Sequence, residues 1–413
     1  MGLRRVLIGL IAGLGLLAVV GSVALAWTLL RPSVSAAALL ISDGTNLRLE
    51  SMGRDSQTIS QELRPAQFRF PAVSPDGTRI AYVANDGEGM AIMSYEVATG
   101  TRTTVYSSSV AEPFDLAWSP DNRHLLFLAP GPAALVLLIV PSDGSAAPTP
   151  IVSGRNIYFA WSDDGSQLAL HVGGHAMEEG RVALYRPGDS APTPVMADPG
   201  FFQAPAFSRD GTAVYYIAQP LTSGQRLTFA ELSATITRVA PDGTNAQPVA
   251  SEKQAALRLV RSPVGDELAY IVQRLTPEGS FTWEGLSLVN AAGCEPRRLS
   301  AEGDRIDAFF WSPDGRKIAY LALSSADAAE RIWKVVDLGS GEVRELASFT
   351  PSAPFAELNI YFDAYQHGYT PWSPDSARLA YAADDGVYVV HTNDGTSEKI
   401  GAGEMVMWAN RNR

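Results

Sequence analysis

The chain has 413 residues, of which 46% are hydrophobic, and a formal net charge of −12. This hydrophobic content excludes a disordered chain, and the acidic balance argues against nucleic-acid binding, which needs basic groups to replace phosphate counterions. The length and the scattered 36 Gly and 27 Pro indicate several domains or one large, turn-rich β-fold, and the single cysteine, Cys294, excludes an internal disulfide framework and a cysteine-built zinc site.

The first predicted element is an apolar segment at residues 6–30, which carries no charge and follows two arginines. As a helix rising ~1.5 Å per residue it is long enough to cross a hydrocarbon core of ~30 Å, so we predict a transmembrane helix, or uncleaved signal anchor, between a cytoplasmic end (1–5) and a linker (31–35). The arginines favour a single-pass cell-membrane protein with its N-terminus in the cytoplasm and the rest periplasmic or at the cell surface. A cleaved signal peptide, which would leave the protein secreted, is the alternative.

From Val73 onward a single motif recurs along the chain. It reads "WSPDGRKIAYLA" from Trp311, and its other copies start at Val73, Trp118, Trp161, Phe207, Arg261 and Trp372. The seven copies start about 43 to 61 residues apart, a period typical of propeller blades. Each copy is followed by a second apolar stretch and a polar turn, so each unit offers four short strands.

The motif is explained by turn chemistry without a ligand. Pro presets φ at the first turn position, Asp hydrogen-bonds to the backbone ahead of it, and Gly occupies the position with positive φ. The Trp or Phe before the turn is expected to pack between neighbouring blades. We therefore interpret the copies as strand-connecting turns and not as seven metal or phosphate sites.

The two ends of the chain complement each other. Residues 36–59 match the later part of a repeat but lack its first strand, and the C-terminal "GEMVMWANRNR" supplies one that ends at Trp408. We predict an all-β fold in which residues 36–413 form a β-propeller of eight four-stranded blades, its ring closed when the C-terminal strand completes the N-terminal blade. Seven blades are the alternative, if no strand forms at residues 36–41.

The repeated "W-S-P-D-G-x-x-I-A-Y" signature resembles the WD40-like β-propeller repeats of the TolB family. The resemblance covers nearly everything after residue 35, and it implies the propeller fold. Related propellers include both interaction scaffolds and substrate-gating domains of proteases, so the resemblance implies no single function. The chain differs from TolB in its predicted blade number, in its predicted anchor and in lacking room for a separate N-terminal α/β domain.

Longer loops are predicted on one face of the propeller, opposite the regular Ser-Pro-Asp-Gly turns, and such loops commonly carry binding residues. Two of them, at 274–285 and 349–370, hold aromatic clusters suited to recognition. The ligand-binding candidates are Phe281, Trp283, Phe355, Tyr361, Phe362, Tyr365, His367 and Tyr369. The alternative is that these side chains fold back over the propeller as a small core of their own.

The sequence offers little support for catalysis, a metal or a cofactor. In "HVGGHAMEE", two glycines separate His171 from His175, and His171 ends a predicted strand, so the helical spacing of a metal site is absent. No Gly-x-Ser-x-Gly nucleophile motif occurs. We predict no cofactor and no metal site, and a non-catalytic, membrane-anchored scaffold that recognises a protein, peptide or glycan of the cell envelope through the loop-rich face. The alternative is a glycosidase- or lyase-type propeller enzyme that uses carboxylates in the central funnel on envelope polymers.

Overall fold

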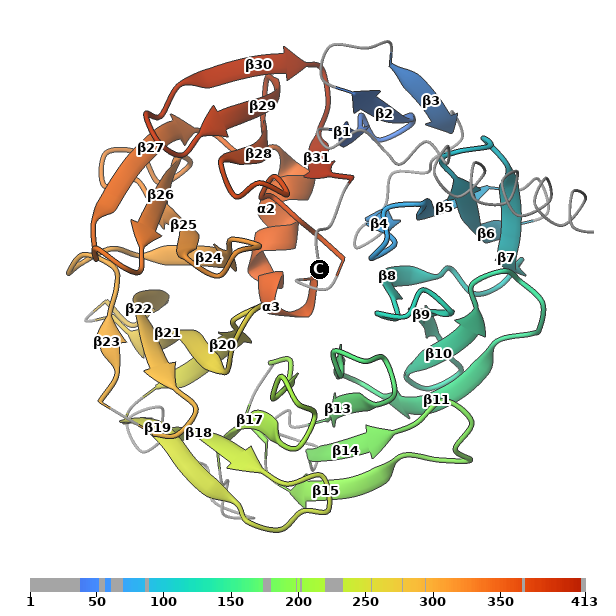
Figure 1. Cartoon of the computed structure of the whole chain (residues 1–413), viewed down its shortest axis with the longest axis horizontal. Coiled ribbons are helices and arrows are strands. Elements are labelled where there is room, and N and C mark those ends of the chain that lie inside the picture. Colours follow the sequence, from blue (N-terminus) through green and yellow to red (C-terminus); the bar gives the residue numbers. More distant parts are fainter. Residues whose placement is uncertain are drawn as a thin grey trace, which may run out of the picture.

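The computed structural model describes residues 38–51, 56–60, 70–85, 89–173, 180–197, 199–200, 203–219, 233–253, 255–276, 278–293, 295–365 and 368–409. These residues form eight antiparallel β-sheets, which are arranged as blades around a central channel (Figure 1). Seven of the sheets have four strands and one has three. The predicted all-β propeller with eight blades is therefore confirmed, and the seven-bladed alternative is wrong.

The strands of the first four blades follow one another from the centre of the ring outward, in the order given. Blade 1 consists of β31 (Met405–Trp408), β1 (Ala38–Ser42), β2 (Leu47–Ser51) and β3 (Gln57–Ser60). Blade 2 consists of β4 (Ala72–Val73), β5 (Arg79–Asn85), β6 (Met90–Glu96) and β7 (Arg102–Ser108). Blade 3 consists of β8 (Phe114–Trp118), β9 (His124–Pro130), β10 (Leu135–Pro141) and β11 (Thr149–Gly154). Blade 4 consists of β12 (Ile157–Trp161), β13 (Leu168–Val172), β14 (Arg181–Tyr185) and β15 (Thr193–Ala197).

The other four blades follow in the same order. Blade 5 consists of β16 (Ala206–Phe207), β17 (Val214–Ala218), β18 (Ser233–Val239) and β19 (Gln247–Lys253). Blade 6 consists of β20 (Ala256–Arg261), β21 (Glu267–Leu275), β22 (Phe281–Asn290) and β23 (Arg297–Arg298). Blade 7 consists of β24 (Ile306–Trp311), β25 (Lys317–Leu323), β26 (Arg331–Asp337) and β27 (Val343–Phe349). Blade 8 consists of β28 (Arg378–Ala383), β29 (Gly386–His391) and β30 (Ser397–Gly401), and its innermost strand is reduced to a bridge between Trp372 and Leu379.

Blade 1 contains strands from both ends of the described chain. Its innermost strand, β31, pairs antiparallel with β1, and Leu39 lies opposite Trp408. Every residue of β31 is buried. The hydroxyl group of Thr370 donates a hydrogen bond of 2.9 Å to the carbonyl of Trp408, which links this strand to blade 8. The pairing removes a strand edge that would otherwise be open to other chains.

The repeated Ser-Pro-Asp-Gly motif forms the turn between the first and second strands of a blade. In blade 7 the hydroxyl group of Ser312 donates to Asp314 Oδ1 (2.6 Å), which also accepts from the Arg316 amide (3.1 Å), and Gly315 has a φ of 67°. The Ser312 hydroxyl group and the Arg316 amide thus find their partner within the turn. The predicted turn is confirmed.

Where Gly is replaced in the motif, the new side chain links neighbouring blades. Asn122 and Ser376 stand at the Gly position with φ values of 62° and 58°, a backbone region that L-residues other than Gly avoid. Asn122 Oδ1 accepts a hydrogen bond of 3.3 Å from the Asp76 amide of blade 2, and Ser376 Oγ accepts one of 3.2 Å from the Asp314 amide of blade 7. These bonds partly offset the backbone strain.

The aromatic residue at the start of the motif packs between blades, as predicted. The indole N–H of Trp372 in blade 8 donates a hydrogen bond of 2.9 Å to the carbonyl of Phe310 in blade 7. Trp118 makes the same bond to Ala72, and Trp311 to Val260, each in the preceding blade. In these three tryptophans the partner of the buried indole N–H is a carbonyl of the neighbouring innermost strand.

The predicted location in a membrane is contradicted. Across the residues that the structure describes, no helix has the length and apolar character needed to span a bilayer. The two helices among the described residues have eight and four residues, whereas a span needs ~20. The apolar segment on which the prediction was based, residues 6–30, and its flanks at 1–5 and 31–35 lie outside the described residues.

Candidate functional site in the central channel

Two helices occupy the centre of the ring, where the sequence predicted an irregular loop. They are α2 (Ala353–Ile360) and α3 (Phe362–Tyr365), which connect blades 7 and 8 (Figure 1). The hydroxyl group of Ser352 caps α2 by accepting a hydrogen bond of 3.3 Å from the Phe355 amide, and a proline lies in the first turn. Pro favours the first turn because its missing N–H needs no partner there. The helices contact β20, β24 and β28, so they line the channel from blades 6 to 8.

Four of the predicted ligand-binding aromatics belong to the core of this segment. Phe355, Phe362, Tyr365 and Tyr369 are all buried, with exposed fractions of 8% or less. Phe362 packs edge-on against Phe309 of β24, with ring centroids 4.9 Å apart. Their placement corresponds to the alternative interpretation, a small core that folds back into the propeller. Tyr361 is half-buried, and His367 lies outside the described residues.

The other two predicted aromatics lie on a hairpin of blade 6. Strands β21 and β22, of nine and ten residues, are the longest of the described strands, and Leu275 stands opposite Phe281 near the hairpin tip. Phe281 is 56% exposed, and Trp283 is half-buried. The guanidinium group of Arg258 stacks on Trp283 at 4.6 Å and donates a hydrogen bond to the carbonyl of Ile360 in α2. The two predicted loops therefore meet at Arg258.

Arg258 also forms a buried ion pair. Its Nε lies 3.7 Å from Oδ1 of Asp363 in α3, and both side chains are less than 10% exposed. The other oxygen of Asp363 accepts a hydrogen bond of 3.2 Å from the Ala204 amide of blade 5. Burial raises the pKa of Asp363, and the Arg258 charge opposes that rise. The pair fixes α3 to blades 5 and 6.

One position recurs in every blade at a fixed offset from the motif. It is the residue three before the motif's first position, or before Trp408, and it lies in the innermost strand or up to three residues before it. These residues are Phe70, Asp115, Tyr158, Ala204, Arg258, Ala308, Tyr369 and Met405. Sequence reasoning passed over Asp115, Tyr158 and Arg258, although the offset could have identified all three. The members with a polar group come from blades 3, 4, 6 and 8, and α2 and α3 contact the innermost elements of blades 6 to 8.

Asp115 is an unusual carboxylate at the start of β8. Its side chain is buried, its φ is 52°, and the pairing register between β8 and β9 shifts at this point. Burial raises the pKa of Asp115 to about 7. Its charge in turn raises the pKa of the buried Tyr365, which burial already raises. A carboxyl group in this state exchanges its proton near neutral pH.

His171 lies in β13 of blade 4 and is held in a neutral state. Its Nδ1 lies 2.8 Å from the carbonyl oxygen of Gln203, and its ring is 1% exposed. Burial lowers the pKa of His171 to about 4. The described residues hold no group of three or more His, Cys, Asp or Glu side chains placed to bind a metal ion. The nearby His175, Glu178 and Glu179 lie outside these residues, as does Cys294.

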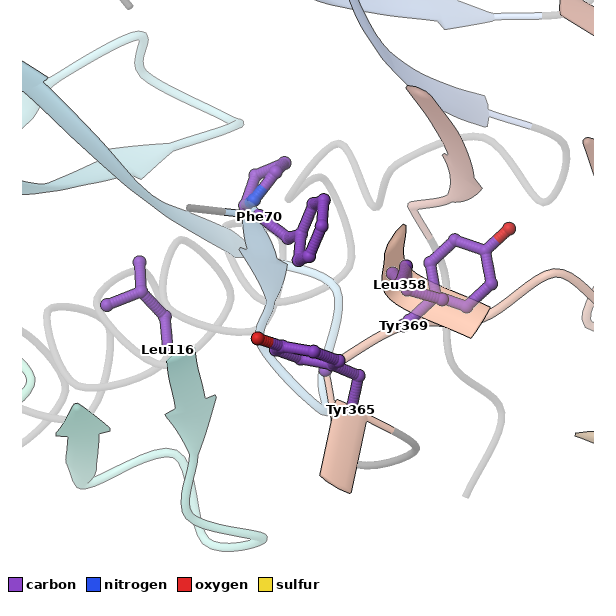
Figure 2. A pocket seen from close by; sticks show the side chains of 7 residues that line it. Phe70, Leu116, Leu358, Tyr365 and Tyr369 are labelled. Atoms are coloured by element: carbon purple, nitrogen blue, oxygen red, sulfur yellow. The ribbon is translucent and has the colours of Figure 1, made fainter. Parts of the chain in front are cut away.

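A pocket opens between blades 2 and 3 and the channel helices. Its cavity volume is about 10 Å³, which is room for about one water molecule. Figure 2 shows Tyr365 with its hydroxyl group directed toward the side on which Leu116 lies, while the hydroxyl group of Tyr369 points away. The pocket is lined by Phe70, Pro71, Leu116, Leu358, Tyr365, Gly368 and Tyr369. Its walls are thus apolar and aromatic, with one phenol group inside.

Comparison with known proteins identifies the fold. No protein-family model and no curated protein matches the chain. Among solved structures, a prolyl endopeptidase matches with a TM-score of 0.56 and 14% identity over 82% of this chain and 49% of its own. A eukaryotic initiation factor matches with a TM-score of 0.55 and 12% identity over 91% and 98% of the two chains. An oligogalacturonate lyase in complex with manganese matches with a TM-score of 0.52 and 14% identity over 82% and 86%.

These similarities concern the fold of the chain. The chain spans about half the length of the prolyl endopeptidase it matches. TolB of Acinetobacter baumannii matches with 16% identity and a TM-score of 0.42 over 80% of this chain and 82% of its own. The resemblance to the TolB family therefore still rests on the repeated motif. At these sequence identities the comparisons show that the chain has a propeller fold. This fold occurs both in enzymes and in proteins without catalytic activity.

Proposed function

We propose that this propeller is a non-catalytic binding module that recognises a protein or peptide through an apolar rim. The apolar rim consists of Leu275, Phe281, Trp283, Ile360 and Tyr361. One observation carries the proposal: Arg258 joins the ring of Trp283, on the hairpin of blade 6, to the backbone carbonyl of Ile360 at the end of α2, so exposed apolar residues of two segments far apart in the sequence flank one arginine. Phe281 and Ile360 are each 56% exposed, and Leu275 is 48% exposed. Monomeric proteins seldom leave such side chains grouped at the surface without a partner.

The chemistry of the rim favours a polypeptide over a glycan. Leu275 and Ile360 present only hydrocarbon, and burying the hydroxyl groups of a sugar against them would leave those groups without hydrogen bonds. An apolar anchor residue of a peptide has no such penalty. Trp283 is stacked on Arg258 and Arg258 is fixed by Asp363, so this part of the rim is ordered before any ligand arrives. A preorganised surface loses less entropy on binding.

A peptide-display library tests the proposal, because it supplies ligands without requiring the partner to be known. Peptides selected on the wild-type protein are titrated against the double variant Phe281→Ser, Ile360→Ser by fluorescence anisotropy. We expect selected peptides to bind the double variant at least tenfold more weakly, since each buried apolar side chain contributes roughly 1.5–3 kcal/mol.

The matched control is Val264→Ser. Val264 is 46% exposed and lies in the turn at the opposite end of β21, on the regular face. This variant should bind the peptides as the wild type does. Equal binding by the wild type and the double variant would show that the rim is not the recognition surface. If the double variant is unfolded by circular dichroism, Leu275→Ser alone replaces it.

A second candidate function is an enzyme that uses a channel carboxylate. The observation that favours it is Asp115, whose pKa of about 7 suits a proton donor at neutral pH. One solved structure with this fold is an oligogalacturonate lyase in complex with manganese. The test is to incubate the protein with oligogalacturonate and Mn²⁺ and to follow the ultraviolet absorbance of unsaturated products. Turnover that is lost in Asp115→Asn would support this candidate, and no turnover by the wild type would reject that substrate.

A further inference from the structure

Two glutamates accompany the apolar rim, one on each of its two segments. Glu278 lies in the tip of the blade 6 hairpin, in a turn where the Gly279 amide donates a hydrogen bond of 2.9 Å to the carbonyl of Thr276. This turn connects Leu275 to Phe281, which stand opposite each other in the hairpin. Glu278 is exposed, so its carboxylate is accessible next to the hairpin residues of the rim.

The second glutamate, Glu357, lies in α2. It precedes Ile360 by three residues and Tyr361 by four, and side chains at these spacings lie on the same side of a helix. Glu357 is half-buried, and burial raises the pKa of its carboxyl group above the ordinary value. This carboxylate has lost part of its hydration at the place where the helix contributes to the rim.

Across the described residues, neither of these glutamates forms an ion pair, and two arginines near the rim are already paired. Arg258 lies next to Asp363. Arg274 lies between two carboxylates, with its Nη2 3.1 Å from Glu252 Oε2 and its Nε 3.3 Å from Glu284 Oε1. The arginines of this region are thus matched by carboxylates of the chain itself, which leaves the two rim glutamates available to a ligand.

The rim therefore combines exposed hydrocarbon with negative charge that has no counter-ion beside it. Lys253, at the end of β19, is an exposed cation whose carbonyl accepts a hydrogen bond of 3.1 Å from Arg274, and it offsets one of the negative charges. The net charge of −12 on the whole chain acts in the same direction as the two glutamates. A negative surface attracts cationic partners during encounter and disfavours acidic ones.

We propose that the partner of the apolar rim is a cationic polypeptide segment, in which apolar anchor residues have lysine or arginine on both sides. This inference rests on the proposed function, because it assigns a chemistry to the partner of the same surface. The anchor residues contact Phe281 and Ile360, and the flanking cations pair with Glu278 and Glu357. A cation beside the half-buried Glu357 is screened less by water than one beside the exposed Glu278. An acidic segment would bring like charges together and is rejected.

Three synthetic peptides with blocked ends test the charge of the partner. They share one core of leucine and tryptophan residues and differ only in the residues on both sides of it, which are lysine, glutamine or glutamate. Each peptide carries a dye and is titrated with the full chain by fluorescence anisotropy at low ionic strength. We expect the lysine peptide to bind at least about tenfold more tightly than the glutamate peptide, with the glutamine peptide between them. Added salt should reduce these differences, because it screens exposed charges.

The double variant Glu278→Gln, Glu357→Gln should bind the lysine peptide about as weakly as the glutamine peptide. Its matched control, Glu295→Gln, Glu398→Gln, removes the same charge from two exposed glutamates, one in the turn between β22 and β23 and one on β30. The control should keep the preference for lysine. An equal loss of preference in the two variants would overturn the assignment to Glu278 and Glu357. If circular dichroism shows that the first variant is unfolded, Glu278→Gln alone replaces it.

No binding of the lysine peptide, or equal binding of the three peptides, would overturn this inference. The rim variant Phe281→Ser, Ile360→Ser then shows which proposal has failed. If this variant weakens the binding of three peptides that the wild type binds equally, the rim is the recognition surface and only the charge of the partner is wrong. If it binds the lysine peptide as the wild type does, the glutamates do not act together with the rim, and both proposals fail.

The display library gives an independent readout of the same inference. Peptides selected on the wild type should contain more lysine and arginine next to apolar residues than peptides selected on Glu278→Gln, Glu357→Gln. The same composition in both selections would contradict a role of the two glutamates in recognition.

Discussion

The Arg258 guanidinium group and the Asp363 carboxylate form a buried ion pair that connects the innermost strand of blade 6 to α3 (Nε–Oδ1 3.7 Å). The same arginine stacks on Trp283 and donates a hydrogen bond to Ile360. One side chain thus joins the propeller wall, the channel helices and the hairpin of blade 6. The apolar rim depends on this junction, because Trp283 and the end of α2 are both placed by it.

Breaking the pair from one side should be strongly destabilising. Arg258→Met leaves Asp363 buried without a counter-ion, and we expect a loss of roughly 3–5 kcal/mol in the free energy of unfolding. The double variant Arg258→Met, Asp363→Leu should lose less than the single variant, because no charge is left buried. Urea denaturation measures both. The exposed pair Lys399–Asp385 (2.9 Å) is the control, and Lys399→Met should change stability far less than Arg258→Met does. A double variant as unstable as the sum of its single changes would contradict this account.

Asp115 should make the protein less stable as the pH rises. Its pKa is about 7 in the folded protein and 3.8 as the reference for the unfolded chain, so only the folded state holds this proton between those values. The free energy of unfolding therefore falls as the pH rises from about 4 to about 7. At about 1.4 kcal/mol per pKa unit, the shift from 3.8 to about 7 sets an upper limit of about 4 kcal/mol. Asp115→Asn should gain stability at pH 8 and little at pH 4, as measured by urea denaturation.

His171 should have the opposite effect in the same pH range. Its pKa is lowered from 6.5 to about 4, so the unfolded chain binds the proton first as the pH falls. Stability is fully present above about pH 6.5 and is lost toward pH 4. In the wild type, the contributions of Asp115 and His171 to the pH dependence of stability have opposite signs. A variant that lacks one of these residues should therefore show the contribution of the other. His171→Gln should therefore be most stable in acid relative to the wild type, and parallel pH curves for the two proteins would contradict this assignment.

The hydrogen bonds between blades can be tested with two tryptophans. Trp372→Phe removes the donor to the Phe310 carbonyl and leaves that buried acceptor without its bond. Trp161 is also buried, but its indole N–H has no hydrogen-bond partner among the described residues. We expect Trp372→Phe to lower the free energy of unfolding by roughly 1–3 kcal/mol more than Trp161→Phe does. Equal losses would show that packing alone accounts for these residues.

The turn carboxylates should stabilise the fold only at pH values at which they are ionised. Asp210 accepts hydrogen bonds from the Ser208 hydroxyl group (2.7 Å) and from the amide and hydroxyl groups of Thr212. These bonds lower the pKa of Asp210 to about 2. Asp210→Ala should cost about 1 kcal/mol at neutral pH, and the difference from the wild type should vanish as the pH falls from about 4 to about 2. Glu302→Ala, at an exposed turn position, should show neither effect.

The propeller could be predicted from the repeats because each turn is formed by residues that are close together in the sequence. Ser312, Asp314 and Gly315 form their bonds within a few residues, so the residue pattern is sufficient to indicate the turn. The departures at Asn122 and Ser376 were harder to interpret, since their bonds reach into the neighbouring blade. The helices of 349–370 were missed although Ser352 and Pro354 carry a start signal, because the aromatic residues there favoured a loop interpretation.

The sequence by itself determined the class of fold, the repeated turn and the number of blades, because period, turn residues and alternating strands are encoded over short distances. Only the tertiary structure decided what fills the channel. Arg258 and Asp363 are far apart in the sequence, and nothing local to either indicates that they pair. Burial decides which of the predicted aromatics stays at the surface, as Phe281 does, and which joins the core, as Phe355 does. The ionisation of Asp115 likewise follows from its distance from water, which is a property of the assembled ring.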